Sequence, residues 1–341
     1  MENNLSTENS LRGMICGTGQ VMFQQNLWCS LLFLIGIFWG AWAEGRISVA
    51  WGGLVGLIVS YLTGRILGLK AEEGEQGLWG FNGVLVGCAI MTFLRSTPLT
   101  WCILILGAAH TVWLREGLNR IMAKWKVNSM TMPFVLTTWM LLLAARGLNG
   151  LPIEGLSSPM FPHAATAHIA TEFLHLLLYW LRGIGQVFLI DSWITGLFFL
   201  AGLIAANGWS AFWAAFASAL SLAVALLFDA PGLGISEGLY GFSPVLTGIA
   251  LGSIFYHPSW RSALWAVVGI VITLFAQAAT NSLLAPLGLP SLTAPFCFVT
   301  WVFLLPMFSF EKHPFSKKSD PSRHEADHSD WNPARKPHLK G

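Results

Sequence analysis

The sequence predicts an all-α polytopic membrane protein with about ten transmembrane helices, arranged as two inverted five-helix repeats with re-entrant pore half-helices. Three observations lead to this fold class. Of the 341 residues, 54% are hydrophobic and only 11% are charged, whereas soluble domains carry about a quarter charged residues. Apolar stretches long enough to cross a bilayer recur along the chain. Three sequence blocks of the first half also return in the second half in the same order.

The apolar stretches give ten candidate spans, five in each half. The first-half candidates are residues 18–40, 47–69, 84–96, 98–114 and 132–146. The second-half candidates are residues 186–206, 209–228, 244–257, 261–277 and 292–309. Segments 84–96 and 244–257 are short for a full crossing, and each follows a Gly-rich segment that we expect to enter the membrane as a re-entrant half-helix.

The segments outside the spans complete the predicted organisation. We expect an N-terminal cytoplasmic peptide (1–16), a first repeat (17–147), a linker with an amphipathic helix (148–182), a second repeat (183–310) and a disordered cytoplasmic tail (311–341). With ten spans and the N-terminus inside, 15 of the 19 Lys and Arg residues fall on the cytoplasmic side. A multi-pass protein of the inner (plasma) membrane with both termini cytoplasmic follows.

The internal repeat is carried by blocks separated by 166, 161 and 162 residues. GTGQV at 17–21 returns as GIGQV at 183–187, GLWGFNGVLVG at 77–87 as GLYGFSPVLTG at 238–248, and TMPF at 131–134 as TAPF at 293–296. An odd number of spans per half makes the second half run through the bilayer in the opposite direction. Inverted repeats place the substrate path between the halves and build it from broken helices.

The repeated blocks contain no repeated Asp, Glu, Lys, Arg or His. A pore without paired ionisable groups is unsuited to binding ions or relaying protons, so a small neutral solute is favoured. The repeated Gln and Thr residues can accept and donate hydrogen bonds, which suits a small amide. Phe81 and Phe242 are expected to form the flat walls of a slot. The alternatives are lipid-facing rings for the phenylalanines and helix–helix hydrogen bonds for the Gln and Thr residues.

Both Gly-Leu-aromatic-Gly-Phe blocks, together with GLPSLTAPF at 288–296, resemble the signature of the urea transporter family over about residues 17–309. The resemblance implies channel-like facilitated diffusion of urea and a homotrimer in lipid whose subunits each have a pore. The substrate-binding residues that it implies are Gln20, Val21, Phe23, Phe81, Leu85, Thr131, Gln186, Val187, Phe242, Leu246 and Thr293. Two departures are Ser243-Pro244 in place of Asn82-Gly83, and Leu189 in place of Phe23.

Other functions stay open at this point. The pore could pass ammonia, water or other small amides, and a proton-coupled symporter would need an acid such as Asp191 to face the path. Because the counterpart of Asp191 is Gln25, we expect Asp191 to be an interfacial residue near a helix start. We expect no enzyme activity, cofactor or metal, because the sequence has no nucleophile–base pair or zinc spacing. Scattered basic residues and a net charge of +2 do not suit a nucleic-acid partner.

Overall fold

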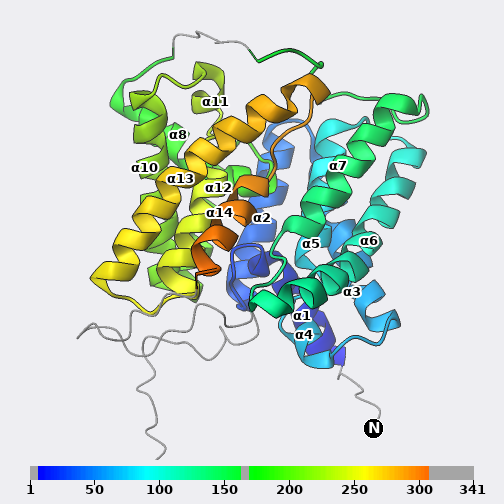
Figure 1. Cartoon of the computed structure of the whole chain (residues 1–341). Coiled ribbons are helices and arrows are strands. Elements are labelled where there is room, and N and C mark those ends of the chain that lie inside the picture. The colour runs from blue at the N-terminus through cyan, green and yellow to red at the C-terminus, as the bar shows by residue number, and fades with distance from the viewer. Residues whose placement is uncertain (1–6, 163–168, 307–341) are drawn as a thin grey trace, which may run out of the picture.

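The computed structural model describes residues 7–162 and 169–306, and each half of this described part contains seven α-helices in matching order (Figure 1). The first half holds α1 (Thr7–Gln20), α2 (Leu27–Ala43), α3 (Ile47–Ile66), α4 (Ala71–Glu75), α5 (Phe81–Phe93), α6 (Pro98–Met122), which η1 (Ala123–Trp125) extends, and α7 (Met132–Gly147). The second half holds α8 (Phe173–Gly185), η2 (Gln186–Phe188), α9 (Trp193–Ala206), α10 (Gly208–Leu227), α11 (Gly232–Ser236), α12 (Phe242–Ile249), η3 (Ala250–Ile254), α13 (Trp260–Leu284), η4 (Ala285–Leu287) and α14 (Ala294–Leu304).

Several of the described helices can cross a membrane. Four are long and apolar enough on their own, and they are Ile47–Ile66, Pro98–Trp125, Gly208–Leu227 and Trp260–Leu287. A fifth candidate is the pair Phe173–Phe188 and Trp193–Ala206, which is bent by 74° at a short break. Five further apolar helices, including α5 and α14, are shorter. The prediction of an all-α protein with several membrane-capable helices is therefore confirmed.

Two predicted spans are wrong as continuous helices. Segment 18–40 is divided, because α1 ends at Gln20 and α2 begins only at Leu27. Phe23 interrupts the helix with a left-handed φ of 61°, and Asn26 caps α2 by accepting a hydrogen bond from the Cys29 N–H.

Segment 186–206 is divided in the corresponding place. Leu189 has a φ of 60°, and the Ser192 side chain caps α9. Helix α1 also begins at Thr7, inside the segment predicted as an N-terminal peptide. The predicted tail 311–341 and linker residues 163–168 lie outside the described residues.

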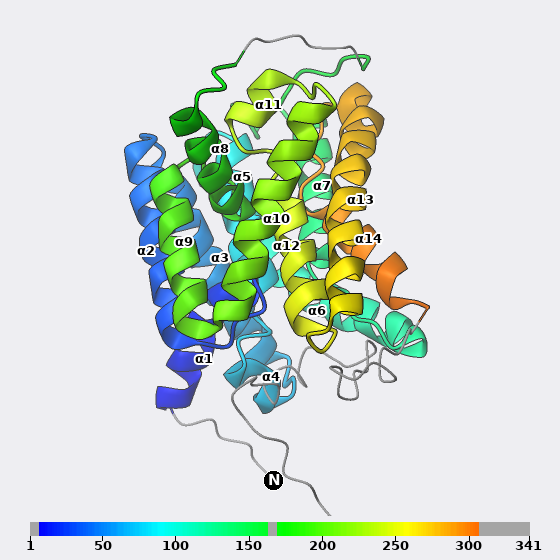
Figure 2. The same cartoon turned by 90° about the vertical axis from the view of Figure 1, so that its left-hand side faces the viewer.

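Counterpart helices of the two halves pack against each other. Helices α2 and α9 lie side by side in Figure 2 and run antiparallel, because Gly40 meets Thr195 whereas Gly36 meets Phe199. The Thr195 hydroxyl donates to the carbonyl of Gly36 over 2.7 Å. An antiparallel pair of corresponding helices is what an inverted repeat requires.

Two reciprocal hydrogen bonds also connect the halves. The indole N–H of Trp139 donates to the carbonyl of Pro290 over 2.8 Å, and that of Trp301 donates to the carbonyl of Asn128 over 2.9 Å. Each donor and each acceptor is separated from its counterpart by 162 residues. Such a reciprocal pair places a local two-fold relationship near the centre of the molecule, where α7 and α14 begin.

Candidate functional site

The centre of the molecule is occupied by two threonines that face each other. Thr131 and Thr293 precede α7 and α14, and each is only 2% exposed. Their hydroxyl oxygens lie 2.7 Å apart, which is hydrogen-bonding distance. The residues before them, Met130 and Leu292, both take left-handed φ angles, of 48° and 49°. The same left-handed backbone in both halves therefore presents the two hydroxyls to each other.

One neighbour makes the threonine pair asymmetric. The Thr131 hydroxyl also lies 3.3 Å from the Sγ atom of Cys297, which is fully buried on α14. The corresponding first-half residue is Val135, also fully buried, which offers only methyl groups. Thr131 therefore has a polar neighbour whose counterpart near Thr293 is apolar.

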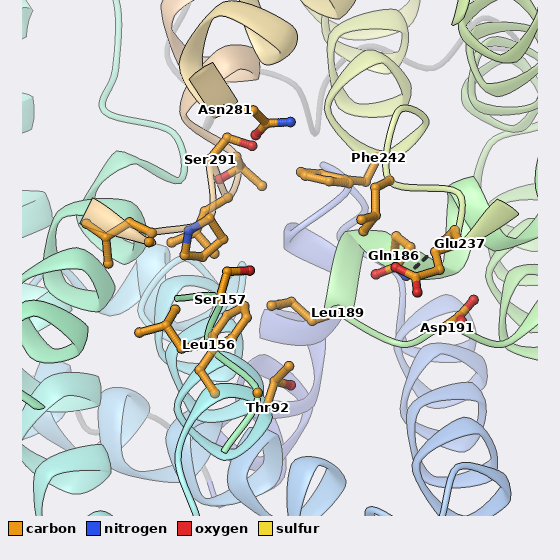
Figure 3. Close-up of a pocket in the computed structure, with 18 of the residues that line it drawn as sticks. Thr92, Leu156, Ser157, Gln186, Leu189, Asp191, Glu237, Phe242, Asn281 and Ser291 are labelled. Atoms are coloured by element: carbon orange, nitrogen blue, oxygen red, sulfur yellow. Dashed lines mark hydrogen bonds between the residues drawn. The ribbon is translucent and has the colours of Figure 1, made fainter. Parts of the chain in front are cut away.

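A cavity of about 800 Å³ lies on the side of Thr293 that faces the linker, and Figure 3 shows it. We call it the linker-side vestibule, because linker residues 155–158 and 160 form part of its wall. Phe242 reaches into it from the start of α12, with Gln186, Glu237 and Asp191 to one side of the ring (Figure 3). The remaining lining residues used below are Glu44, Arg46, Thr92, Val187, Leu189, Gln277, Asn281, Gly288 and Ser291.

The vestibule brings together four of the predicted site residues, namely Gln186, Val187, Phe242 and Thr293. Leu246 is fully buried one turn beyond Phe242 on α12 and is not part of the vestibule wall. Thr131 joins the group through its contact with Thr293. The second-half residues thus converge on one cavity.

The predicted first-half residues do not line the vestibule. Phe81 and Leu85 lie on α5 and are 3% and 0% exposed, and Val21 is 1% exposed in the turn after α1. Phe23 packs edge-on against Phe296 of the second half, with ring centroids 6.1 Å apart. Phe81, Leu85 and Val21 are therefore buried, whereas Phe242 of the second half lines the vestibule.

The two repeated glutamines are held in the same way. The Gln20 amide donates from Nε2 to the carbonyl of Gln76 over 2.8 Å, and the Gln186 amide donates to the carbonyl of Glu237 over 2.9 Å. These acceptors are themselves counterparts, 161 residues apart. Because only the NH₂ end can pair with a carbonyl, each Oε1 is directed away from that bond and is free to act as an acceptor.

The starts of α5 and α12, which carry Phe81 and Phe242, are fixed by different side chains. The Asn82 amide accepts from the N–H of Phe134 and donates to the carbonyl of Met130, at 3.1 and 3.3 Å. Ser243, which replaces Asn82, makes one longer bond of 3.4 Å to the carbonyl of Leu292. The departure noted in the sequence therefore keeps the same connection between helices but with fewer hydrogen bonds.

The environments of the Phe81 and Phe242 rings differ more strongly than these helix starts do. The guanidinium of Arg115 on α6 lies 6.0 Å from the ring centroid of Phe81 and pairs with Glu73 at 2.8 Å. Its counterpart on α13 is Gln277, which is 1% exposed and donates to the carbonyl of Leu239. A fixed cation therefore accompanies the first ring, whereas a neutral amide shares the vestibule with the second.

Acidic side chains gather at the vestibule wall. Asp191 precedes α9, as predicted, and its Oδ1 lies 3.2 Å from the Nε of Arg182. Burial raises the pKa of Glu44, which follows α2, and the nearby Asp191 carboxylate adds to this shift, whereas Arg46 and Arg182 oppose it; the resulting pKa is about 7. Burial also raises the pKa of Glu237, and Arg182 opposes this shift.

Sequence reasoning missed several vestibule residues. Gln277 and Asn281 are polar residues one turn apart on an apolar helix, a pattern that could have indicated a polar face. Glu44 and Glu237 carry no such signal, because they lie outside the repeated blocks and come from separate segments, after α2 and after α11.

Comparison with known proteins identifies relatives of this chain. The sequence model of the family described as "Urea transporter" matches residues 11–307. Urea transporter 1 of sheep (Ovis aries) is 29% identical over 293 residues, which cover 85% of this chain and 75% of the relative. Urea transporter 1 of mouse (Mus musculus) is 28% identical over 296 residues, with the same two coverages.

Proposed function

The chain belongs to the urea transporter family, a family of transporters rather than enzymes, and transports urea across a membrane; we propose that urea diffuses passively through a pore formed between the two halves. The proposed path enters the linker-side vestibule, passes Phe242, crosses between Thr131 and Thr293, and leaves past Phe81. The observation that carries the proposal is the threonine pair, since two equivalent half-sites meet there at 2.7 Å.

The residues along this path match the chemistry of urea. Urea is planar, carries four N–H donors and has one carbonyl acceptor. The Oε1 atoms of Gln20 and Gln186 can accept from the N–H groups, because their Nε2 atoms are engaged with backbone carbonyls. The threonine hydroxyls can exchange their mutual hydrogen bond for bonds to urea as it passes. The rings of Phe81 and Phe242 would admit a flat molecule and exclude a hydrated ion. Four apolar residues would complete these walls, namely Val21, Leu85, Val187 and Leu246.

A passive mechanism follows from the residues that are repeated. Neither half contributes an ionisable side chain to the repeated positions on the path. Asp191 lies at the vestibule wall, where it pairs with Arg182 and has no repeated acidic counterpart. Because the vestibule is the entrance of the proposed path, the ionophore arm of the experiment below tests a proton-coupled role for Asp191. A proton-coupled symporter, or a channel for ammonia, water or other small amides, is the alternative that the experiment below separates.

The same proposal extends to the assembly and its membrane. We expect a homotrimer with one pore per subunit, inserted in the inner (plasma) membrane with both termini in the cytoplasm. Helix-end tryptophans with large exposed fractions, such as Trp28 at 70% and Trp42 at 65%, suit interfaces with lipid headgroups. Cross-linking in native membranes, and protease accessibility of each terminus, would test these two expectations.

Urea efflux from proteoliposomes, followed by stopped-flow light scattering with and without a proton ionophore, tests the transport mechanism. We expect fast efflux that the ionophore does not change and that Phe242→Trp reduces at least tenfold, because a larger ring fills the slot. Phe173→Trp is the matched control, since Phe173 is 82% exposed on α8. Efflux that stops with the ionophore would favour a symporter. Efflux no faster than through empty liposomes, with ammonia or water flux retained, would reject urea as the solute.

A further inference from the structure

The two slots differ at one buried position that corresponds in both halves. In the first half, the guanidinium of Arg115 lies over the ring of Phe81 and is only 7% exposed. In the second half, Gln277 occupies the corresponding position and lines the same cavity as Phe242. The first half thus carries a built-in planar cation beside its slot ring, and the second half carries none at that position.

The second half supplies the acceptors that such a cation needs. The Nε2 atoms of Gln186 and Gln277 donate to the backbone carbonyls of Glu237 and Leu239, so both amide oxygens are left as acceptors. Within the described residues, Oε1 of Gln277 has no hydrogen-bond partner, although this side chain is 99% buried at the cavity wall. A buried carbonyl oxygen without a donor is costly, so the site favours a ligand rich in N–H groups.

The charges of the vestibule are distributed unevenly. Glu237 and Asp191 lie together on one side in Figure 3, with Thr92 and Ser157 across the cavity. Arg46 donates to the carbonyl of Thr92, and Arg146 donates to those of Ser157 and Gly288, on that opposite wall. The carboxylates of Glu237 and Asp191 are therefore near Phe242, whereas Arg46 and Arg146 are engaged with backbone carbonyls of the opposite wall.

From this comparison we propose that the linker-side vestibule binds a small planar cation of the guanidinium class, between the ring of Phe242, the oxygen of Gln277 and the carboxylates of Glu237 and Asp191. Guanidinium has the flat outline of urea and only N–H donors, and it has no acceptor that would be left unsatisfied against these oxygens. Its placement over an aromatic ring beside a carboxylate reproduces what Arg115 does with Phe81 and Glu73.

One neighbouring cation sets the strength of this site. Arg182 lies between Asp191 and the segment before α12, where it donates to the carbonyl of Ser236 over 2.8 Å. It therefore satisfies part of the Asp191 charge and competes with a free cation. Binding in the millimolar range, rather than tight binding, is the expected result, and guanidinium bound there would obstruct the entry of urea to the Phe242 slot.

Isothermal titration of the detergent-solubilised protein with guanidinium chloride, against tetramethylammonium chloride at equal ionic strength, tests the site. We expect saturable binding of guanidinium but not of tetramethylammonium, which is neither planar nor an N–H donor. Gln277→Arg should weaken the binding at least tenfold, because it places a guanidinium where the first half already has one. Asp191→Asn, which leaves the cavity volume nearly unchanged, should weaken it several-fold.

The control is Glu72→Gln, which removes an exposed carboxylate from α4. Affinity unchanged in this variant and lowered in the other two would support the site. Equal affinity in Gln277→Arg, equal binding of tetramethylammonium, or the absence of saturable binding to the wild type would overturn it. The slowing of urea efflux by guanidinium rests on the proposed function, whereas the titration does not. A protein that binds guanidinium without carrying urea would therefore refute only the proposed function.

Discussion

The two halves of this chain share one plan but pack their slot helices differently. In the first half, α5 packs on α3 through glycine: a Cβ atom placed on Gly56 or Gly87 would overlap the backbone carbonyl of Gly83 or Gly52. In the second half, α12 packs on α10 through larger residues. Trp213 stands where Gly52 stands in the first half, and Ala217 where Gly56 stands.

This difference shows which features the repeat has kept. The residues that would contact the solute correspond in both halves, as do the left-handed residues Phe23 and Leu189 that end the preceding helix. The helix-packing residues and the charges around the slots have changed. A closely packed first half with a fixed Arg115 therefore faces a second half that is open to an acidic vestibule.

The largest expected effect comes from the same substitution in both halves. Gly87→Ala should lower the melting temperature by about 5 °C or more, because its methyl group meets the Gly52 carbonyl and the backbones must separate. At the counterpart Gly248 the overlap is smaller, because the new methyl lies 2.7 Å from the Cβ of Ala217 and 3.1 Å from the Trp213 carbonyl, so about half that loss is expected. Tryptophan fluorescence during thermal unfolding in detergent measures both melting temperatures. Equal decreases in melting temperature would contradict the proposed packing difference between the halves.

The threonine pair provides the second comparison. Thr131→Val and Thr293→Val should each reduce urea efflux about tenfold, since each removes a hydroxyl that can bond to urea at the narrowest point. The fold-reduction of urea efflux in the double variant should be smaller than the product of the two single-variant reductions, because both single changes break the same 2.7 Å contact. Cys297→Val, which makes the second half match Val135, is the control for the thiol contact. Fully multiplicative losses would indicate that the two hydroxyls act separately.

The sequence predicted the fold class and the paired residues because repetition and apolar length are visible without a structure. Thr131 and Thr293, or Gln20 and Gln186, could be singled out since each matched pair lies in a repeated block. The division of segments 18–40 and 186–206 was missed, because residues at the breaks, Phe23 and Leu189, are apolar and give no turn signal.

The acidic vestibule also escaped sequence analysis, for a different reason. Glu44, Asp191 and Glu237 come from three separate segments, and the counterparts of Asp191 and Glu237 are the uncharged Gln25 and Gln76. The proximity of Glu44 to Asp191 depends on the antiparallel contact of α2 with α9, which joins residues far apart in the chain. Neither local periodicity nor the repeat carries information on such a contact.

The glutamine pair should show a smaller and more symmetric effect. Gln20→Leu and Gln186→Leu should each slow urea efflux about two- to tenfold, because each removes one acceptor of the kind that contributes about 0.5–1.5 kcal/mol. Each change also leaves a backbone carbonyl, that of Gln76 or of Glu237, without its donor. Parallel melting curves separate this loss of stability from the loss of transport. A tenfold effect in one half with none in the other would show that only one half-site binds urea.

The smallest expected effect concerns Glu44 and depends on pH. The pKa of Glu44 is raised from an ordinary value of 4.5 to about 7, first by burial and then by the Asp191 carboxylate. Between these two values the folded protein holds a proton that the unfolded chain releases, so the stability due to this proton is complete below pH 4.5 and is lost as the pH rises through 7. Glu44→Gln, which cannot ionise, should melt about 2 °C above the wild type at pH 8 and show almost no difference at pH 5, the shift being modest because Glu44 is only half-buried.

The exposed Glu72→Gln provides the comparison at the opposite end of the molecule. A melting-temperature difference between Glu44→Gln and the wild type that is constant from pH 5 to pH 8 would mean that Glu44 ionises as it does in the unfolded chain. Burial at the vestibule wall would then not raise the pKa of this carboxylate.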